Sequence, residues 1–129
     1  MNLYSKLAQL QEQGLPIRLG LIGAGKFAAM YLAQVPKTPG IHMVAIADLS
    51  PDNAKNNLKR VGWDDERFGA CSLDEALSKG QTYVTDDWEE LTKNPKIDII
   101  IEATGSPMEA VSHVLAAIEN GKHIVHCER

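Results

Sequence analysis

A short glycine-rich segment holds the residues whose types and spacing most clearly suggest chemistry. Its sequence is Gly23-Ala24-Gly25-Lys26-Phe27-Ala28, which fits the pattern G-x-G-x-x-G/A of dinucleotide-binding turns. Gly23 permits a tight turn, and Gly25 lacks the Cβ atom that would hold a pyrophosphate away from the backbone. Ala28 is small enough for a helix to pack closely on a strand. The segment predicts a phosphate site at a helix N-terminus, where free N–H groups favour negative charge.

An acidic residue stands where such a turn needs one. Asp48 lies 48 − 28 = 20 residues beyond Ala28 and follows the apolar run 41–47, which matches the expected spacing of about 20. Its carboxylate can accept hydrogen bonds from both hydroxyls of an adenosine ribose, and it would repel a 2′-phosphate. We therefore expect NAD or NADP as the cofactor, with NAD favoured. Three cations could still approach after folding: Lys55, Lys59 and Arg60.

A second segment of small residues follows the apolar run 97–101. Ala103-Thr104-Gly105 lies on the carboxyl side of that predicted strand, where doubly wound sheets bind ligands. Small residues there would let the nicotinamide half of a cofactor lie against the backbone, although a plain strand-to-helix turn is the alternative. Lys26 contacts a phosphate or points to solvent, and Glu102 is a loop carboxylate or a site residue. Both alternatives stay open.

The elements that must position these residues alternate between strands and helices. Apolar runs predict strands over 17–22, 41–47, 83–85, 97–101 and 123–126. This order predicts an α/β fold, a doubly wound parallel (Rossmann) sheet of about five strands over residues 17–129 with right-handed crossovers. A separate helix is expected within residues 1–16, where apolar side chains recur at helical spacing before a Gly and a Pro: Leu3, Tyr4, Leu7 and Leu10.

Capping patterns predict where the other helices begin. Ser50 precedes Pro51, Asp87 precedes Trp88, and two segments have the spacing of a capping box, Ser72 to Glu75 and Ser106 to Glu109. The segment 26–35 is a further helix, ended by Pro36 and Pro39, and 62–70 is a polar loop. The helix after Ser106 carries four large apolar residues on one face before Gly121: Val111, Val114, Leu115 and Ile118.

Composition narrows the class of protein. The 129 residues are 44% apolar and 23% charged with a net charge of −4, which gives no footprint for nucleic acid or an anionic membrane. No run is long enough to span a bilayer, and the first residues lack a secretion signal. Cys71 and Cys127 are too few and too far apart for a disulfide framework, and the four histidines show no ligand spacing. We expect structural or surface histidines, no metal and a cytoplasmic location.

Several segments resemble known oxidoreductases. Residues 17–27, 45–51 and 101–105 are similar to homoserine-dehydrogenase-like oxidoreductases that carry a C-terminal SAF domain, a group that includes reductoisomerase-like members. Residues 85–91 and 121–129 resemble the wider glucose–fructose oxidoreductase and inositol dehydrogenase family. That family continues into a Glu-Lys-Pro segment whose lysine serves catalysis. This chain has Glu128-Arg129 instead, and an arginine stays charged at any working pH and cannot exchange the proton.

The resemblance implies the first domain of a longer enzyme. Such an enzyme would transfer hydride between NAD(P) and a small polar carbonyl or hydroxy compound, with its catalytic residues beyond Arg129, so the chain alone is expected to be inactive. A non-catalytic NAD(P)-binding or regulatory module would have the same sequence features, and a different adenosine nucleotide is a third possibility. The apolar face of the N-terminal helix suggests a homo-oligomer.

Overall fold

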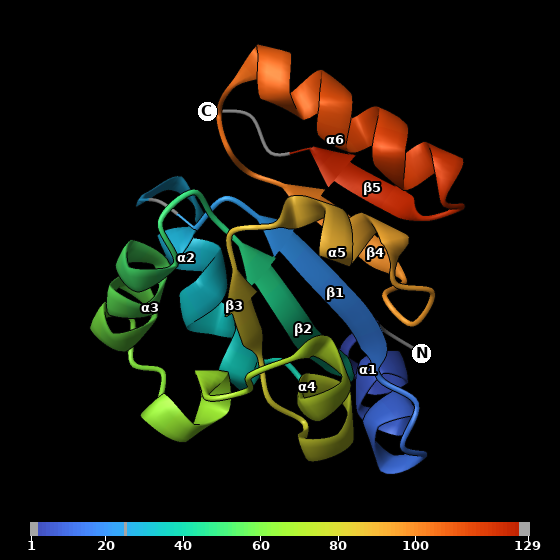
Figure 1. Ribbon diagram of the computed structural model, residues 1–129. Coiled ribbons are helices and arrows are strands. Elements are labelled where there is room, and N and C mark those ends of the chain that lie inside the picture. Colours follow the sequence, from blue (N-terminus) through green and yellow to red (C-terminus); the bar gives the residue numbers. More distant parts are fainter. Residues whose placement is uncertain (1–2, 25, 127–129) are drawn as a thin grey trace.

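A single parallel sheet forms the centre of the molecule. The computed structural model describes residues 3–24 and 26–126, and within them five strands lie in the order β3-β2-β1-β4-β5 (Figure 1). Their bounds are β1 (Ile17–Ile22), β2 (Ile41–Ala47), β3 (Tyr83–Thr85), β4 (Ile99–Glu102) and β5 (His123–His126). Every pairing is parallel. The order changes direction at β1, between β2 and β4, so the predicted doubly wound Rossmann sheet is confirmed.

Helices cover both faces of this sheet. Their bounds are α1 (Leu3–Glu12), α2 (Lys26–Gln34), α3 (Pro51–Arg60), α4 (Leu73–Lys79), α5 (Trp88–Lys93) and α6 (Pro107–Glu119). Side chains of α2 and α3 pack in one buried layer, and side chains of α4, α5 and α6 pack in the other. The predicted N-terminal helix is present as α1, and the Gln11 side chain anchors it by accepting a hydrogen bond from Gly40 N at 2.8 Å. The side chains of three of its apolar residues lie outside the description: Leu3, Tyr4 and Leu7.

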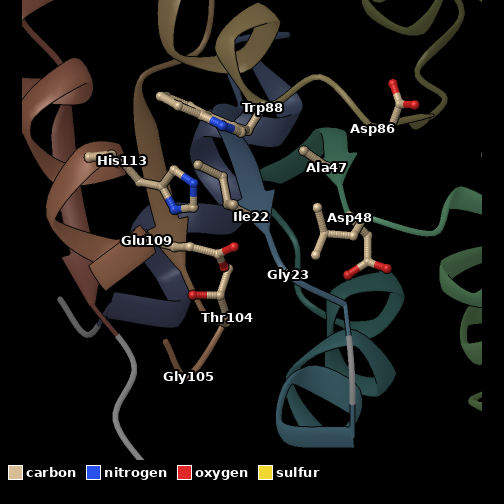
Figure 2. Close-up of a pocket in the computed structure, with 13 residues that line it drawn as sticks. Ile22, Gly23, Ala47, Asp48, Asp86, Trp88, Thr104, Gly105, Glu109 and His113 are labelled. Atoms are coloured by element: carbon tan, nitrogen blue, oxygen red, sulfur yellow. The ribbon is translucent and has the colours of Figure 1, made fainter. Parts of the chain in front are cut away.

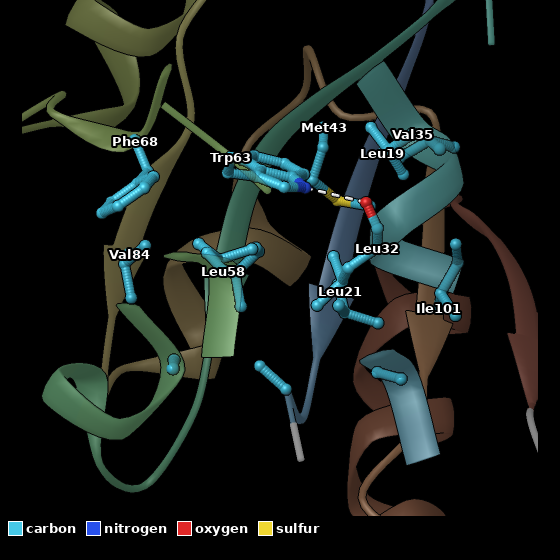
Figure 3. Close-up of a cluster of buried hydrophobic side chains, with 14 of the residues drawn as sticks. Leu19, Leu21, Leu32, Val35, Met43, Leu58, Trp63, Phe68, Val84 and Ile101 are labelled. Atoms are coloured by element: carbon cyan, nitrogen blue, oxygen red, sulfur yellow. Dashed lines mark hydrogen bonds between the residues drawn. The ribbon is translucent and has the colours of Figure 1, made fainter. Parts of the chain in front are cut away.

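The layer under α2 and α3 includes a segment that the sequence suggested was only a polar loop. Residues 62–70 contain a 3-10 helix, η2 (Asp65–Phe68), and bury two aromatic side chains, Trp63 and Phe68. Figure 3 shows Trp63 against α2, where its indole Nε1 donates to the Leu32 carbonyl at 2.8 Å. The two large aromatic side chains, Trp63 and Phe68, thus anchor the segment to the core.

The predicted helix starts and strand ends agree with the structure at most positions. Ser50, Ser72 and Asp87 each accept a hydrogen bond from a first-turn N–H of the helix that follows. Strand β4 begins two residues later than expected, because Asp98 turns its carboxylate to Arg18 N at 2.9 Å while Ile97 packs in the core. Among the described helices, none is long and apolar enough to cross a membrane.

Helix α6 departs most from its sequence pattern. Three of the four large apolar residues of its predicted face are turned to solvent, since Val111, Leu115 and Ile118 are all more than half exposed, whereas Val114 is half-buried. The helix packs on the sheet with a narrow face instead, which consists of Ala110, His113 and Ala117. The expected capping box is also wrong, because the Ser106 side chain makes no cap hydrogen bond. The backbone N–H of Ser106 donates to Thr104 Oγ at 3.3 Å, so a residue of the preceding turn holds the chain where the helix begins.

A half-buried histidine gives the fold a pH dependence. His42 Nε2 bonds to the Gln81 carbonyl at 2.7 Å and so joins the beginnings of β2 and β3. Burial lowers the pKa of His42 below its ordinary 6.5, and the hydrogen bond to Gln81 offsets part of this shift by raising the pKa. The positive charges of Arg18 and Arg67 lower the pKa further. Because the folded pKa lies below the unfolded one, protonation opposes folding. This stabilising contribution is complete above pH 6.5 and declines as the pH falls through the folded pKa.

Replacing His42 with glutamine should make stability less sensitive to acid. The amide of a His42→Gln variant can still donate to the Gln81 carbonyl but does not titrate. We expect urea unfolding at about pH 7.5 and about pH 5 to show a larger loss of unfolding free energy for the native chain than for the variant. An equal loss in both proteins would contradict the assignment to His42.

Candidate functional site

The carboxyl ends of β1, β2 and β4 border one pocket of about 860 Å³ (Figure 2). Five of the residues singled out in the sequence line it: Gly23, Asp48, Ala103, Thr104 and Gly105. Ala24 follows Gly23 and is buried at 1% exposure. Gly25 and the side chains of Lys26 and Phe27 lie outside the described residues. The structure therefore brings the glycine-rich turn, the acidic residue and the second small-residue segment to one cavity.

Gly23 makes this convergence possible. Its φ of +95° is the left-handed region that favours glycine. A Cβ atom at this position would lie 2.9 Å from the backbone carbon and oxygen of Ala103 and from Thr104 N. The turn therefore touches the segment after β4 directly. The sequence assigned Gly23 to a tight turn, and the structure adds this close contact between two chain segments.

The Asp48 carboxylate is fixed beside the turn. Its Oδ1 accepts a hydrogen bond from Ala24 N at 3.2 Å, and its Oδ2 accepts one from Ser50 N at 3.1 Å. A carboxylate has about four lone-pair sites, so each oxygen can still accept one more hydrogen bond. The orientation of Asp48 is thus set by backbone donors, while its acceptor capacity toward the pocket is retained.

A residue that the sequence did not single out helps to hold the turn. Asn57 of α3 donates from Nδ2 to the Ala24 carbonyl at 2.8 Å. Its Oδ1 accepts a hydrogen bond from Arg60 at 2.7 Å. Nothing in the local pattern separates Asn57 from the other polar residues of α3, because the contact spans 33 positions of sequence. Lys59 forms an exposed ion pair with Asp65 at 3.8 Å, and Arg60 donates to Asn57, so both cations already have a polar partner.

The segment after β4 is held from beneath by Glu102. This side chain is fully buried, and its Oε1 accepts hydrogen bonds from Thr104 N at 2.8 Å and Thr104 Oγ at 2.5 Å. Its Oε2 bonds to Nδ1 of His113, which is 4% exposed. The hydroxyl and the backbone N–H of Thr104 are therefore both committed to Glu102. Glu102 thus organises the site from behind.

Two aromatic rings, Trp88 and His113, line one end of the pocket. The sequence did not connect either residue with the glycine-rich turn. Trp88 of α5 and His113 of α6 meet there with ring centroids 4.5 Å apart and planes at 64°, an edge-to-face contact. Glu109 lies one helical turn before His113 and lines the same end. The spacing of four residues between Glu109 and His113 was the available signal, since it places both side chains on one face of a helix.

The chain is similar in sequence and in fold to known dehydrogenases. A homoserine dehydrogenase from Neisseria gonorrhoeae is 29% identical over 114 residues, which cover 85% of this chain and 22% of that protein. The crystal structure of a homoserine dehydrogenase from Thiobacillus denitrificans aligns with a TM-score of 0.62 at 25% identity, over 88% of this chain and 23% of the other. The myo-inositol dehydrogenase from Lactobacillus casei, solved with NAD(H) and myo-inositol, has the same TM-score at 20% identity and shows a common fold, over 86% of this chain and 28% of that one.

The chain thus spans less than a third of the length of each of these relatives. The family model described as an oxidoreductase family with an NAD-binding Rossmann fold matches residues 17–129, which is the sheet, its covering helices after α1 and the pocket. The chain belongs to this family of NAD-binding Rossmann oxidoreductases.

Proposed function

We propose that the pocket holds a nicotinamide dinucleotide in a defined direction. The pyrophosphate lies at the turn from Gly23 to Ala28, the adenosine ribose at Asp48, and the nicotinamide half along Ala103-Thr104-Gly105. The observation that carries this proposal is that Gly23, Asp48 and the segment after β4 border a single cavity at the point where the strand order reverses. Ligands of open α/β sheets bind at that point.

The residues of this chain bind and orient the dinucleotide, and the dinucleotide supplies the hydride chemistry. The first N–H groups of α2 favour the negative charge of the pyrophosphate, and we assign Lys26 to the same phosphates. The fixed Asp48 carboxylate accepts the two ribose hydroxyls. Apolar walls, among them Ile22 and Trp88, keep water from the nicotinamide end.

We further propose that NAD is preferred to NADP. A 2′-phosphate on the adenosine ribose would lie beside the Asp48 carboxylate, and like charges at short range repel. Two of the three cations close in sequence have other partners, namely Asp65 for Lys59 and Asn57 for Arg60. This pairing supports the preference, because neither cation needs a phosphate as a partner.

The activity of the whole protein is proposed from the relatives. They include homoserine and myo-inositol dehydrogenases, which supports hydride transfer to or from a small polar carbonyl or hydroxy compound. The chain would be the first domain of a longer enzyme, since it spans less than a third of those proteins. A C-terminal SAF domain and a homo-oligomer formed through α1 stay predictions. The exposed apolar residues of α6 offer a surface for a further domain.

Titration with NADH and with NADPH tests the proposal on the 129-residue chain. Trp88 lines the pocket whereas Trp63 is buried under α2, so bound NADH should quench mainly Trp88 fluorescence. We expect saturable quenching with tighter binding of NADH than of NADPH. A Trp88→Phe variant, checked by calorimetry, should bind NADH with little quenching. Absence of binding of either dinucleotide at millimolar concentration would contradict the cofactor proposal, and tighter NADPH binding would contradict the preference.

A further inference from the structure

A buried carboxylate–histidine pair lies at the nicotinamide end of the pocket, and the contacts proposed so far leave one of its nitrogens unused. Glu102 is 0% exposed and His113 is 4% exposed. His113 lines the pocket, whereas Glu102 lies beneath Thr104. Both groups are ionisable, and such groups are seldom buried without a structural or functional reason.

The hydrogen bonds decide how the imidazole ring is oriented. Oε1 of Glu102 accepts from Thr104, and Oε2 is bonded to Nδ1 of His113. A carboxylate can only accept hydrogen bonds. The proton of the ring therefore sits on Nδ1, and in the neutral ring Nε2 is left as an acceptor. None of the hydrogen bonds among the described residues uses Nε2. Figure 2 shows this second nitrogen pointing away from Thr104 and toward Ile22, below the Trp88 indole.

The surroundings of Nε2 fit a flat aromatic ring that carries one amide. The apolar and aromatic walls around Nε2 are Ile22 and Trp88, and the Glu109 carboxylate lines the same end of the pocket (Figure 2). Among the described residues, the buried side-chain atoms without a hydrogen-bond partner are Arg18 Nε and Gln81 Oε1, so Nε2 is open to the pocket. A donor of a bound ligand can replace water on this nitrogen. A nicotinamide ring would place its flat face between the walls and its carboxamide N–H on the nitrogen.

We propose that His113 binds the carboxamide of the nicotinamide through Nε2, and that Glu102 is a positioning residue that fixes the ring. This inference rests on the proposed function, since it assumes that the dinucleotide occupies the pocket. Glu102 also holds Thr104 through two hydrogen bonds. The Glu102 carboxylate thereby positions two groups. One is the Thr104 backbone, along which the nicotinamide half lies, and the other is the His113 imidazole, which binds the carboxamide of the nicotinamide.

Three ligands separate the nicotinamide end from the rest of the pocket. NAD⁺ carries the carboxamide, 3-acetylpyridine adenine dinucleotide replaces its NH₂ with a methyl group, and ADP-ribose lacks the ring. The native chain should bind the acetylpyridine compound about threefold to tenfold more weakly than NAD⁺, as one lost hydrogen bond predicts. Equal binding of the two dinucleotides by the native chain would overturn the proposal.

Two substitutions at one position provide matched variants. The amide nitrogen of His113→Asn replaces Nδ1 and keeps a donor for Glu102, while nothing remains in place of Nε2. The longer His113→Gln variant keeps a polar group near the position of Nε2. We expect His113→Asn to bind NAD⁺ about threefold to tenfold more weakly, with unchanged binding of ADP-ribose and no preference for NAD⁺ over the acetylpyridine compound. His113→Gln should recover part of that preference.

The outcomes distinguish this inference from the function on which it rests. If the native chain binds neither NAD⁺ nor ADP-ribose, the proposed function fails. If both ligands bind and His113→Asn weakens them equally, His113 has only a structural role and the inference fails. If His113→Asn binds NAD⁺ and the acetylpyridine compound with the same ratio as the native chain, Nε2 does not contact the carboxamide. Thermal unfolding of each variant, with and without ADP-ribose, shows that the chain is folded in the assay.

Discussion

Replacing Gly23 with alanine should abolish NADH binding and destabilise the fold. The added Cβ atom would lie 2.9 Å from backbone atoms of Ala103 and Thr104, which cannot rotate away as a flexible side chain can. The φ of +95° adds strain for any residue with a Cβ atom. Backbone strain costs about 1–3 kcal/mol and overpacking about 1–3 kcal/mol, so we expect a loss of about 2–6 kcal/mol in the free energy of unfolding.

Gly62 offers a matched control within the same chain. Its φ is +97°, and no heavy atom would lie within 4 Å of an added Cβ. Gly62→Ala should therefore show the strain alone, about 1–3 kcal/mol, and should bind NADH as the native chain does. Urea unfolding of the three proteins, followed by NADH titration under conditions where each is folded, separates strain from contact. Equal stability losses in both variants, with NADH binding retained by Gly23→Ala, would contradict the close approach between the turn and the segment after β4.

The parts of the site that the sequence predicted are those with local signals. The turn at Gly23 lies between an apolar strand and a helix, and Asp48 follows the next strand at a fixed spacing, so each could be identified from its neighbours in the chain. The predicted bounds of β1, β2, β3 and β5 match the structure for the same reason. In each case a run of apolar residues is bounded by turn or capping residues.

The contacts that the sequence missed join distant positions. The Glu102–His113 pair spans 11 residues and crosses from a strand to a helix. Asn57 reaches the turn from 33 residues away. No periodicity encodes such pairs, because they depend on how α3 and α6 pack against the sheet. The sequence predicts a structural or surface histidine at position 113, and the structure buries His113 against Glu102 in the lining of the pocket.

Helix α6 shows why an amphipathic pattern can mislead. The large apolar face predicted by Val111, Leu115 and Ile118 is exposed, while Ala110 and Ala117 face the sheet. Small residues allow the helix backbone to approach the strands closely, and the His113 imidazole fills the remaining space beside Trp88. The apolar periodicity therefore predicts a helix here but does not predict which of its faces packs on the sheet.

Replacing Asp48 with asparagine should weaken NADH binding and largely remove the preference over NADPH. The carboxylate would accept charge-assisted hydrogen bonds from the ribose hydroxyls, each contributing about 1.5–3 kcal/mol. Losing the charge should weaken NADH binding by about tenfold to a hundredfold, at about 1.4 kcal/mol for each factor of ten. NADPH should lose much less, because the variant no longer repels the 2′-phosphate. Calorimetric titration of both dinucleotides gives the ratio of affinities.

Asp86→Asn is the matched control for this change. Asp86 lines the same pocket and its substitution alters the net charge equally, but its side chain is not in the group that fixes the turn. We expect Asp86→Asn to shift both affinities by a similar small factor and leave their ratio unchanged. Because Asp48 also accepts from Ala24 N and Ser50 N, Asp48→Asn leaves one backbone N–H without its acceptor and should lower stability by about 1–3 kcal/mol. A fall in affinity for NADH and NADPH by the same factor would show that Asp48 only supports the turn, whereas a change in their ratio that is specific to Asp48→Asn identifies the ribose contact.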